Sequence, residues 1–215
     1  IYFSLLKREV TMEFYEIHPE NPQEKLINKA VEVLKKGGVI IYPTDTVYGI
    51  GCDIMNQQAL QRVFDIKGET QTKLYSFVCP DLKDISKYAK VSDNAFKLMK
   101  KAIPGPYTFI LPASKDVPKK LWAKRQTVGI RVPDNKIALT IAKELGNPIV
   151  STSVTNWKGD LILDPLEIKV LMHNKVDLML SQGNLPGVVS TIVDMSNDEV
   201  EIIREGAGDT SLFLQ

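Results

Sequence analysis

Two spacings of apolar residues alternate along most of this chain, and this alternation restricts its fold more than any other feature. Ile27, Ala30, Val31 and Leu34 recur at intervals of three and four residues, which predicts an amphipathic helix. The apolar run "VIIYP" follows and predicts a buried strand. Helix and strand patterns continue to alternate, and consecutive strand patterns close the chain. This order predicts an α/β fold with a mixed sheet.

Local signals set the expected bounds of these elements. We expect helices over 21–37, 56–67, 92–103, 135–146 and 164–175. We expect strands over 39–43, 74–79, 108–113, 127–133, 148–154, 177–183, 190–196 and 199–206, the last two joined as a hairpin. The first helix is predicted to begin with Asn21 as N-cap, Pro22 at its first position and Glu24 in a capping box. Gly37 is predicted to end it.

The composition is that of an ordinary globular protein, with 44% hydrophobic and 25% charged residues among 215. We expect residues 12–215 to form one domain. Residues 1–11 hold some apolar side chains but no signal-peptide pattern, and we expect an extension upstream of a natural start at Met12. The formal net charge of +1 gives no overall basic character, although a local basic cleft is compatible with it.

Cysteine and histidine usage argues against a zinc site. Cys52 and Cys79 are isolated, and His18 and His173 are the chain's two histidines, so no metal-ligand spacing occurs. Two isolated cysteines are typical of a reducing compartment, and we expect a cytoplasmic protein in which Cys79 is packed. The histidines are expected at the surface. No apolar run reaches about 18 residues, so a membrane span is not expected.

Polar and cationic side chains gather where the predicted strands begin or end. They are Thr44, Asp45, Thr46, Tyr48, Lys67, Thr108, Arg131, Ser151, Thr152, Ser153, Thr155, Asn156, Ser190, Thr191 and Arg204. Ligands of α/β proteins commonly bind at such strand ends. Hydroxyls combined with single Arg and Lys side chains suit a phosphate or carboxylate ligand. The predicted chemistry is positioning and charge neutralisation, as in phosphoryl or nucleotidyl transfer.

Each of these residues also has a purely structural interpretation. Ser and Thr at strand ends commonly bond to their own backbone in turns, and Asp45 can be a turn former. Arg131 and Arg204 can be solvated or can form structural ion pairs. The helix dipole alone favours a cation at Lys67. The sequence contains neither a Walker A pattern nor GxGxxG, so an ATP site here would be of another type.

Six ordered motifs together resemble the YrdC-like, threonylcarbamoyl-AMP synthase family. They are "GGVIIYPTDTVYGIGCD", "PGPYTFILPA", "VGIRVP", "PIVSTS", "STIVD" and "IIREG", and the resemblance runs from about Asn21 to Gly206. The resemblance implies a single α/β domain with a twisted, mixed and mostly open sheet around a large basic cavity. It implies a nucleotidyltransferase that makes threonylcarbamoyl-adenylate and pyrophosphate from L-threonine, bicarbonate and ATP. Another enzyme then transfers the threonylcarbamoyl group to an adenosine beside the tRNA anticodon.

The resemblance also implies roles for particular residues. For the threonine side it implies Thr44, Thr46, Arg131 and Ser190. For the nucleotide and phosphate side it implies Lys67, Thr108, Ser151, Ser153 and Arg204, with Asn156 as a further candidate. No catalytic residue is assigned separately from these binding residues, and no protein metal site is implied. Mg²⁺ is expected to arrive with ATP rather than in a protein cage.

Two positions depart from the family's pattern. Lys67-Gly68-Glu69 stands where the synthases have Lys-x-Arg, and Asn156 lies one place later than in their Ser-x-Asn. Because Glu69 would put an anion near a triphosphate, we expect weaker synthase activity. The segments at 14–45 and 93–135 resemble the YciO branch of the family most closely, in which such departures are expected.

That branch supplies the alternative interpretation. The chain would then be a YciO-type protein that binds RNA or a nucleotide with little or no synthase activity. The RNA partner would be tRNA or double-stranded RNA. Trp122 and Trp157 lie in polar loops, where an exposed aromatic ring can stack on a base.

Overall fold

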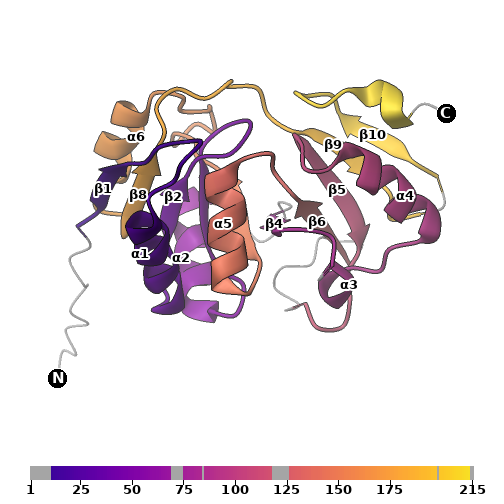
Figure 1. Cartoon of the computed structure of the whole chain (residues 1–215), viewed down its shortest axis with the longest axis horizontal. Coiled ribbons are helices and arrows are strands. Elements are labelled where there is room, and N and C mark those ends of the chain that lie inside the picture. Colours follow the sequence, from indigo (N-terminus) through magenta and orange to yellow (C-terminus); the bar gives the residue numbers. More distant parts are fainter. Residues whose placement is uncertain (1–10, 69–74, 84, 118–125, 198, 214–215) are drawn as a thin grey trace.

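The computed structural model describes residues 11–68, 75–83, 85–117, 126–197 and 199–213. Its centre is an open, mixed sheet with the strand order β1-β8-β2-β3-β7-β4-β6-β5-β9-β10 (Figure 1). The strands are β1 (Glu13–Glu16), β2 (Ile40–Tyr42), β3 (Gly49–Asp53), β4 (Ser76–Val78), β5 (Tyr107–Pro112), β6 (Thr127–Arg131), β7 (Ile149–Ser153), β8 (Leu178–Ser181), β9 (Thr191–Asp194) and β10 (Glu201–Arg204). The predicted α/β class with a mixed sheet is confirmed, and β9 and β10 pair antiparallel as predicted.

Helices connect and cover these strands. They are α1 (Glu24–Lys35), α2 (Gln57–Lys67), α3 (Ile85–Tyr88), α4 (Asp93–Ala102), α5 (Lys136–Leu145) and α6 (Pro165–Met172), followed by the 3-10 turn η2 (Thr210–Phe213). Asn56, Ser92, Asn135 and Asp164 cap four of them through side-chain oxygens that accept backbone N–H bonds. These caps satisfy donors that a helix start leaves unpaired, and their positions agree with the sequence prediction.

The first helix begins later than predicted. Its N-cap is Gln23 rather than Asn21, and no side-chain hydrogen bond caps it. The backbone N of Asn21 donates to Nδ1 of His18 (3.1 Å), and the backbone N of His18 donates to Oε1 of Gln23 (3.0 Å). These bonds hold the preceding segment in a turn, which keeps Asn21 outside the helix. The end is as predicted, because Gly37 takes a left-handed conformation with φ 78°.

The strand β3, which forms an antiparallel pair with β2, was not predicted. Its two glycines and the polar turn before it hide the strand pattern, yet all five of its residues are buried. Gly51 is required by packing, since a Cβ there would lie 2.6 Å from the carbonyl oxygen of Val150. The short elements β1 and α3 were also missed. The stretch "IIYPTDTVYGIG" is therefore a hairpin whose polar part is the loop 43–48.

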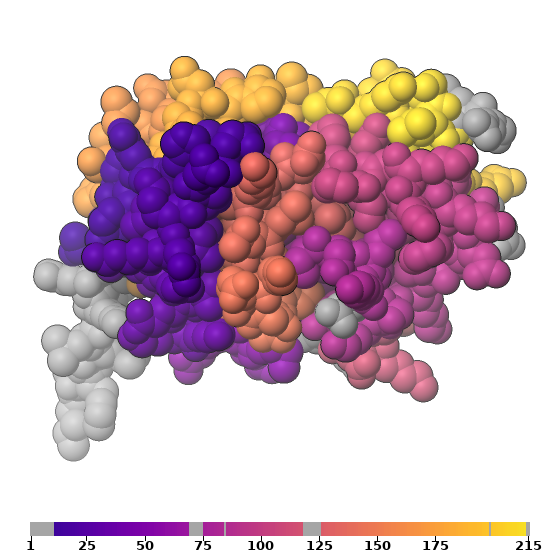
Figure 2. All heavy atoms as spheres, viewed as in Figure 1, coloured from indigo at the N-terminus to yellow at the C-terminus, as the bar shows by residue number. Residues whose placement is uncertain are grey.

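Alternation along the strands divides the apolar core into two layers. Ile40 and Tyr42 pack in a cluster with α1 and α5, whereas Ile41 packs in the larger cluster on the other face, which includes residues of α2. Helices α1 and α5 lie side by side over the first layer (Figure 2, indigo and salmon). They cover only part of that face, and the remainder carries the polar strand residues.

Candidate functional site

A cavity of about 370 Å³ lies on the sheet face opposite the larger core cluster. On five strands one residue packs in that core and its neighbour lines the cavity, as the period of two requires. The core residues are Phe77, Phe109, Ile130, Val150 and Val193, and the neighbours that line the cavity are Ser76, Thr108, Arg131, Ser151 and Ile192. This volume falls in the range of small-molecule sites. We call this cavity the pocket.

Arg131 forms one wall of the pocket and is held by the loop 43–48. Its Nη2 donates to Oδ1 of Asp45 (2.5 Å) and to Oγ1 of Thr46 (2.6 Å). The other carboxylate oxygen of Asp45 accepts from the backbone N of Asp134 (3.0 Å). Arg131 Nε is buried and has no hydrogen-bond partner among the described residues. Among the described residues the guanidinium is therefore held through Nη2, and Nη1 makes none of these bonds.

The two threonines of this loop, Thr44 and Thr46, both accept hydrogen bonds from Arg131. The Thr44 hydroxyl donates to the carbonyl oxygen of Val47 (2.6 Å) and lies 3.3 Å from Nη2 of Arg131 as an acceptor. Thr44 lines the pocket, but its hydroxyl proton is thus already used. Thr46 is fully buried and is not among the pocket-lining residues. Their implied contact with threonine stays a prediction, and the contact that the structure shows is with Arg131.

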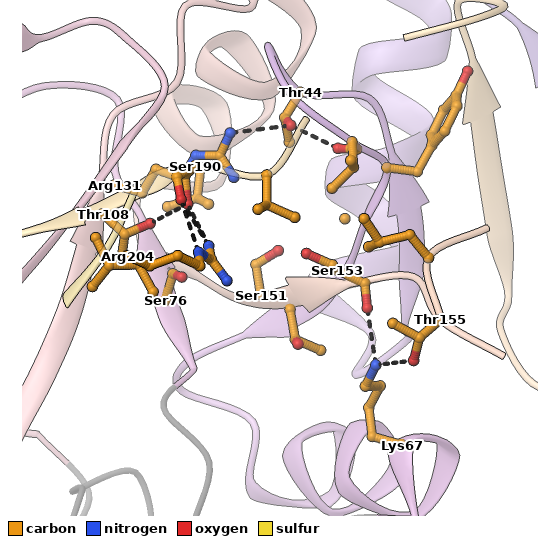
Figure 3. A pocket seen from close by; sticks show the side chains of 18 of the residues that line it. Thr44, Lys67, Ser76, Thr108, Arg131, Ser151, Ser153, Thr155, Ser190 and Arg204 are labelled. Atoms are coloured by element: carbon orange, nitrogen blue, oxygen red, sulfur yellow. Dashed lines mark hydrogen bonds between the residues drawn. The ribbon is translucent and has the colours of Figure 1, made fainter. Parts of the chain in front are cut away.

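Ser190, Thr108 and Arg204 form a second polar group, on the same side of the pocket as Arg131 (Figure 3). The Arg204 Nη2 donates to the carbonyl oxygen of Ser190 (2.8 Å), and the Ser190 and Thr108 hydroxyls lie 2.9 Å apart. Ser190 was implied for the threonine side, yet these bonds join it to two residues implied for the nucleotide side. Burial lowers the pKa of Arg204, and the nearby charge of Arg131 lowers it further. Two cations that repel each other in this way favour an anionic ligand between them.

The third wall comes from β7 and the end of α2. Ser151 and Ser153 point into the pocket from β7 (Figure 3). The hydroxyl of Tyr42, a residue that does not line the pocket, lies 2.8 Å from Oγ of Ser151. Lys67 Nζ donates to the carbonyl oxygen of Ser153 (3.0 Å) and to the hydroxyl of Thr155. Lys67, in the last turn of α2, thus reaches the same pocket as Arg131 and Arg204, and no acidic residue of the described ranges lines it.

A short loop forms the rim beside Lys67. Thr155 and Leu161 pair as an isolated bridge, and both line the pocket together with Gly159. Asn156 lies outside the pocket lining, because its Oδ1 accepts from the backbone N of Lys158 (2.8 Å) and of Asp160 (3.0 Å). Its proposed contact with a nucleotide has no counterpart in this geometry. The same loop carries Trp157, which is 89% exposed with Lys158 Nζ 5.1 Å from its ring centroid.

The sequence did not single out Ser76 as a pocket residue, and it left the contacts of Thr155 and Asp45 open. Ser76 was hidden within a strand pattern, although its place beside core Phe77 could have shown that it faces the pocket. Thr155 was noted only as a polar residue, and its contact with Lys67 depends on the rim loop. Asp45 was interpreted as a turn former, whereas it pairs with Arg131. Glu69 and Trp122 lie outside the described residues.

Comparison with known proteins identifies the family. The Sua5_yciO_yrdC model, described as "Telomere recombination", matches residues 32–206. The chain belongs to the Sua5/YciO/YrdC family. Within this family it is 43% identical over 204 residues to "Uncharacterized protein YciO" of Escherichia coli K12, covering 94% of this chain and 99% of that protein. It is 32% identical over 155 residues to a threonylcarbamoyl-AMP synthase of Coxiella burnetii, covering 72% and 83% of the two chains.

Solved structures of the Sua5/YciO/YrdC family share the fold. The crystal structure of E. coli YciO superposes with a TM-score of 0.89 and covers 94% of this chain and all of that one. P. abyssi Sua5 complexed with L-threonine gives a TM-score of 0.85 at 26% identity, covering 91% of this chain and 58% of that one. The predicted family and the single α/β fold are thus confirmed.

Other features expected of the chain concern metals, membranes and the side chains of cysteine and histidine. The described residues contain no group of three or more His, Cys, Asp and Glu side chains able to hold a metal ion. In the same residues no helix combines the length and apolar character that crossing a bilayer requires. Cys79 is buried, and His18 and His173 are exposed, as predicted. Cys52 is buried as well.

Proposed function

We propose that the pocket binds L-threonine and ATP and forms L-threonylcarbamoyl-adenylate from threonine, bicarbonate and ATP, for the synthesis of N6-threonylcarbamoyladenosine in tRNA. One observation carries the proposal: Lys67, Arg131 and Arg204 reach a single hydroxyl-lined pocket from three separate elements. Relatives named threonylcarbamoyl-AMP synthase and a Sua5 complexed with L-threonine support it.

The proposed reaction needs positioning and charge neutralisation more than a nucleophilic side chain. The threonine nitrogen bonds to the bicarbonate carbon with loss of water, and an oxygen of the resulting carbamate bonds to the α-phosphorus. Pyrophosphate leaves with the electron pair of the broken P–O bond. Negative charge gathers around the α-phosphoryl group during this step, so fixed cations beside it lower the barrier.

The arrangement suggests a division of these cations. Arg131 is fixed by Asp45 through Nη2 and would offer Nη1 to the threonine carboxylate or the carbamate. Arg204 and Lys67 would face the phosphates. Since no acidic cluster is present in the described ranges, a divalent ion would arrive on the triphosphate and keep water ligands, which is the usual manner of Mg²⁺. That ion would neutralise phosphate charge.

The test is product formation. We expect pyrophosphate release that requires ATP, threonine and bicarbonate together, with threonylcarbamoyl-adenylate detected by mass spectrometry. Lys67→Met should lower the rate at least about tenfold, because a charge-assisted contact with phosphate is lost. Lys101→Met is the matched control, since Lys101 lies exposed in the last turn of α4. No product at high enzyme concentration would overturn the proposal.

Glu69→Arg restores the Lys-x-Arg pattern of the synthases and is expected to raise the rate. An unchanged rate would show that Glu69 does not limit activity.

A second candidate function is the binding of RNA without turnover. The observation that favours it is the rim loop, which presents exposed Trp157 and Lys158 next to the pocket. An aromatic ring beside a cation suits an unpaired base with its phosphate. Affinity for a tRNA anticodon stem-loop should then fall steeply with salt and drop when Trp157 is changed to Ala. RNA affinity that is unaffected by salt and by Trp157→Ala would exclude this candidate.

A further inference from the structure

The direction of the hydrogen bond between Ser151 and Tyr42 depends on Tyr42, a residue that does not line the pocket. Its Oγ lies 2.8 Å from the Tyr42 hydroxyl, and this is the single hydrogen bond that either hydroxyl makes with the described residues. Tyr42 is fully buried in the cluster with α1 and α5, whereas Ser151 lines the pocket. The Ser151 hydroxyl can therefore also bond to a ligand or water in the pocket, whereas the Tyr42 hydroxyl has Ser151 alone as its partner among the described residues.

The buried phenol must be the donor of this bond. If Ser151 donated to Tyr42, the phenol proton would have no acceptor, and folded proteins avoid a buried donor without a partner. Ser151 can turn its own proton toward the pocket, where a ligand or water accepts it. Burial raises the pKa of Tyr42 to about 12, so the phenol keeps its proton throughout the neutral range.

A glycine confines the Ser151 hydroxyl from the other side. A Cβ at Gly49 would lie 2.9 Å from Ser151 Oγ and 3.3 Å from Cζ of Tyr42. Gly49 also lines the pocket. The serine oxygen thus lies between the phenol and the Gly49 backbone, which leaves the pocket as the direction open to its proton.

We propose that Tyr42 is a positioning residue that fixes the Ser151 hydroxyl as a hydrogen-bond donor into the pocket, so that Ser151 selects an oxyanion of the ligand. The oxyanion is a phosphate of ATP or the carboxylate of threonine, and in this respect the inference rests on the proposed function. A serine hydroxyl normally donates or accepts according to its partner. Here Tyr42 occupies one of the two lone pairs of the serine oxygen, and the serine O–H is left to donate into the pocket before any ligand binds.

Neutron diffraction on deuterated crystals tests the polarity directly and needs no turnover. We expect the deuteron of Tyr42 between its oxygen and Ser151 Oγ, and the deuteron of Ser151 directed into the pocket. A Ser151 deuteron pointing at the Tyr42 oxygen would overturn the proposal.

Calorimetric binding tests the consequence for ligands. Ser151→Ala is expected to weaken binding of ATP or of threonine roughly 10- to 100-fold, as for loss of a hydrogen bond to a charged group. Tyr42→Phe should weaken binding of the same ligand on the order of threefold to tenfold. Without the phenol the Ser151 oxygen loses its donor, and the Ser151 proton is no longer directed into the pocket. Adenosine and L-threoninamide, which lack the respective anion, should lose little affinity in either variant.

The double variant shows whether Tyr42 acts through Ser151. If it does, Tyr42→Phe has no further effect once Ser151 is Ala, so the two changes are not additive. Additive losses, or wild-type affinity in Tyr42→Phe, would refute the positioning role. Tyr107→Phe is the matched control, because the Tyr107 hydroxyl bonds to the carbonyl oxygen of Asp209 and Tyr107 is not among the pocket-lining residues. Melting temperatures identify a variant that loses affinity only because it unfolds.

The two proposals fail in different ways. Binding of ATP and threonine without product would refute the proposed function and leave the Tyr42 test intact. Absence of binding by both ligands would refute the oxyanion role, while the neutron structure would still decide the polarity.

Discussion

Arg131 and Asp45 form a buried ion pair in the wall of the pocket, with Nη2 and Oδ1 2.5 Å apart and side chains that are 10% and 9% exposed. A charge pair at this depth does not by itself indicate high stability, since desolvation opposes the attraction. It does make each partner costly to remove alone. The pair fixes a guanidinium that lines the pocket, and it joins the loop 43–48 to the pocket wall.

The first prediction concerns Asp45. Asp45→Ala should lower the free energy of unfolding by about 3 kcal/mol, because a buried guanidinium is left without its counter-charge. Asp45→Asn should cost less, since it keeps an acceptor oxygen. Urea unfolding followed by circular dichroism measures both. Glu32→Ala removes the exposed Glu32–Lys36 pair and should leave the midpoint unchanged. An equal effect of Asp45→Ala and Glu32→Ala would mean that the buried pair is not a structural element.

The second prediction separates binding from stability with two glycines. Gly49→Ala places a Cβ 2.9 Å from Ser151 Oγ, so the serine must move and ligand affinity should fall about tenfold or more. Gly146→Ala meets no atom within 4 Å but is strained at φ 77°. It should therefore lower the free energy of unfolding by about 1 kcal/mol without changing affinity. Calorimetry measures the affinity of both variants, and urea unfolding measures their stability. Lost affinity in Gly146→Ala with unchanged affinity in Gly49→Ala would contradict the prediction.

The third prediction concerns alkaline stability. Burial raises the pKa of Cys52 from 9.0 to about 12 and that of Tyr42 from 10.0 to about 12. Each group stays neutral in the folded chain while it ionises in the unfolded chain. The unfolded state then binds fewer protons, so stability is full below pH 9 and falls as pH rises toward 12, by up to about 1.4 kcal/mol per pH unit for each group.

Urea unfolding at several values between pH 8 and pH 11 measures this decline. Cys52→Ala should make the slope shallower between pH 9 and pH 11, whatever its effect at pH 7. If the slope matched that of the wild type, Cys52 would not contribute to the decline.

The fourth prediction concerns the rim loop. Asn156→Ala removes the oxygen that accepts from the backbone N–H groups of Lys158 and Asp160. Amide hydrogen exchange at these two positions should become several-fold faster, because each loses its acceptor. Exchange in α1, far from the loop in the sequence, serves as the internal reference. Unchanged exchange at Lys158 and Asp160 would show that backbone bonds alone hold the loop.

Most of the fold follows from local signals in the sequence. Apolar periodicity located the larger helices and most strands, and Asn56, Ser92 and Asn135 mark helix starts because their side chains cap nearby N–H groups. The start of α1 was wrong because His18, five residues from Gln23, forms a turn that the pattern at Asn21 does not reveal. The strand β3 was missed because pairing with β2 on one side and β7 on the other, rather than a pattern in its own residues, makes it a strand.

The sequence by itself determined that hydroxyls and single cations stand at strand ends, and it predicted a phosphate or carboxylate ligand from them. The tertiary structure alone decided which of them face the pocket and which residues they bond to. Tyr42 and Ser151 are 109 residues apart in the chain, and Arg131 and Asp45 are 86 apart. Contacts of this kind arise when the sheet brings distant strands together, since a hydrogen bond depends on distance and direction, which local sequence patterns do not contain.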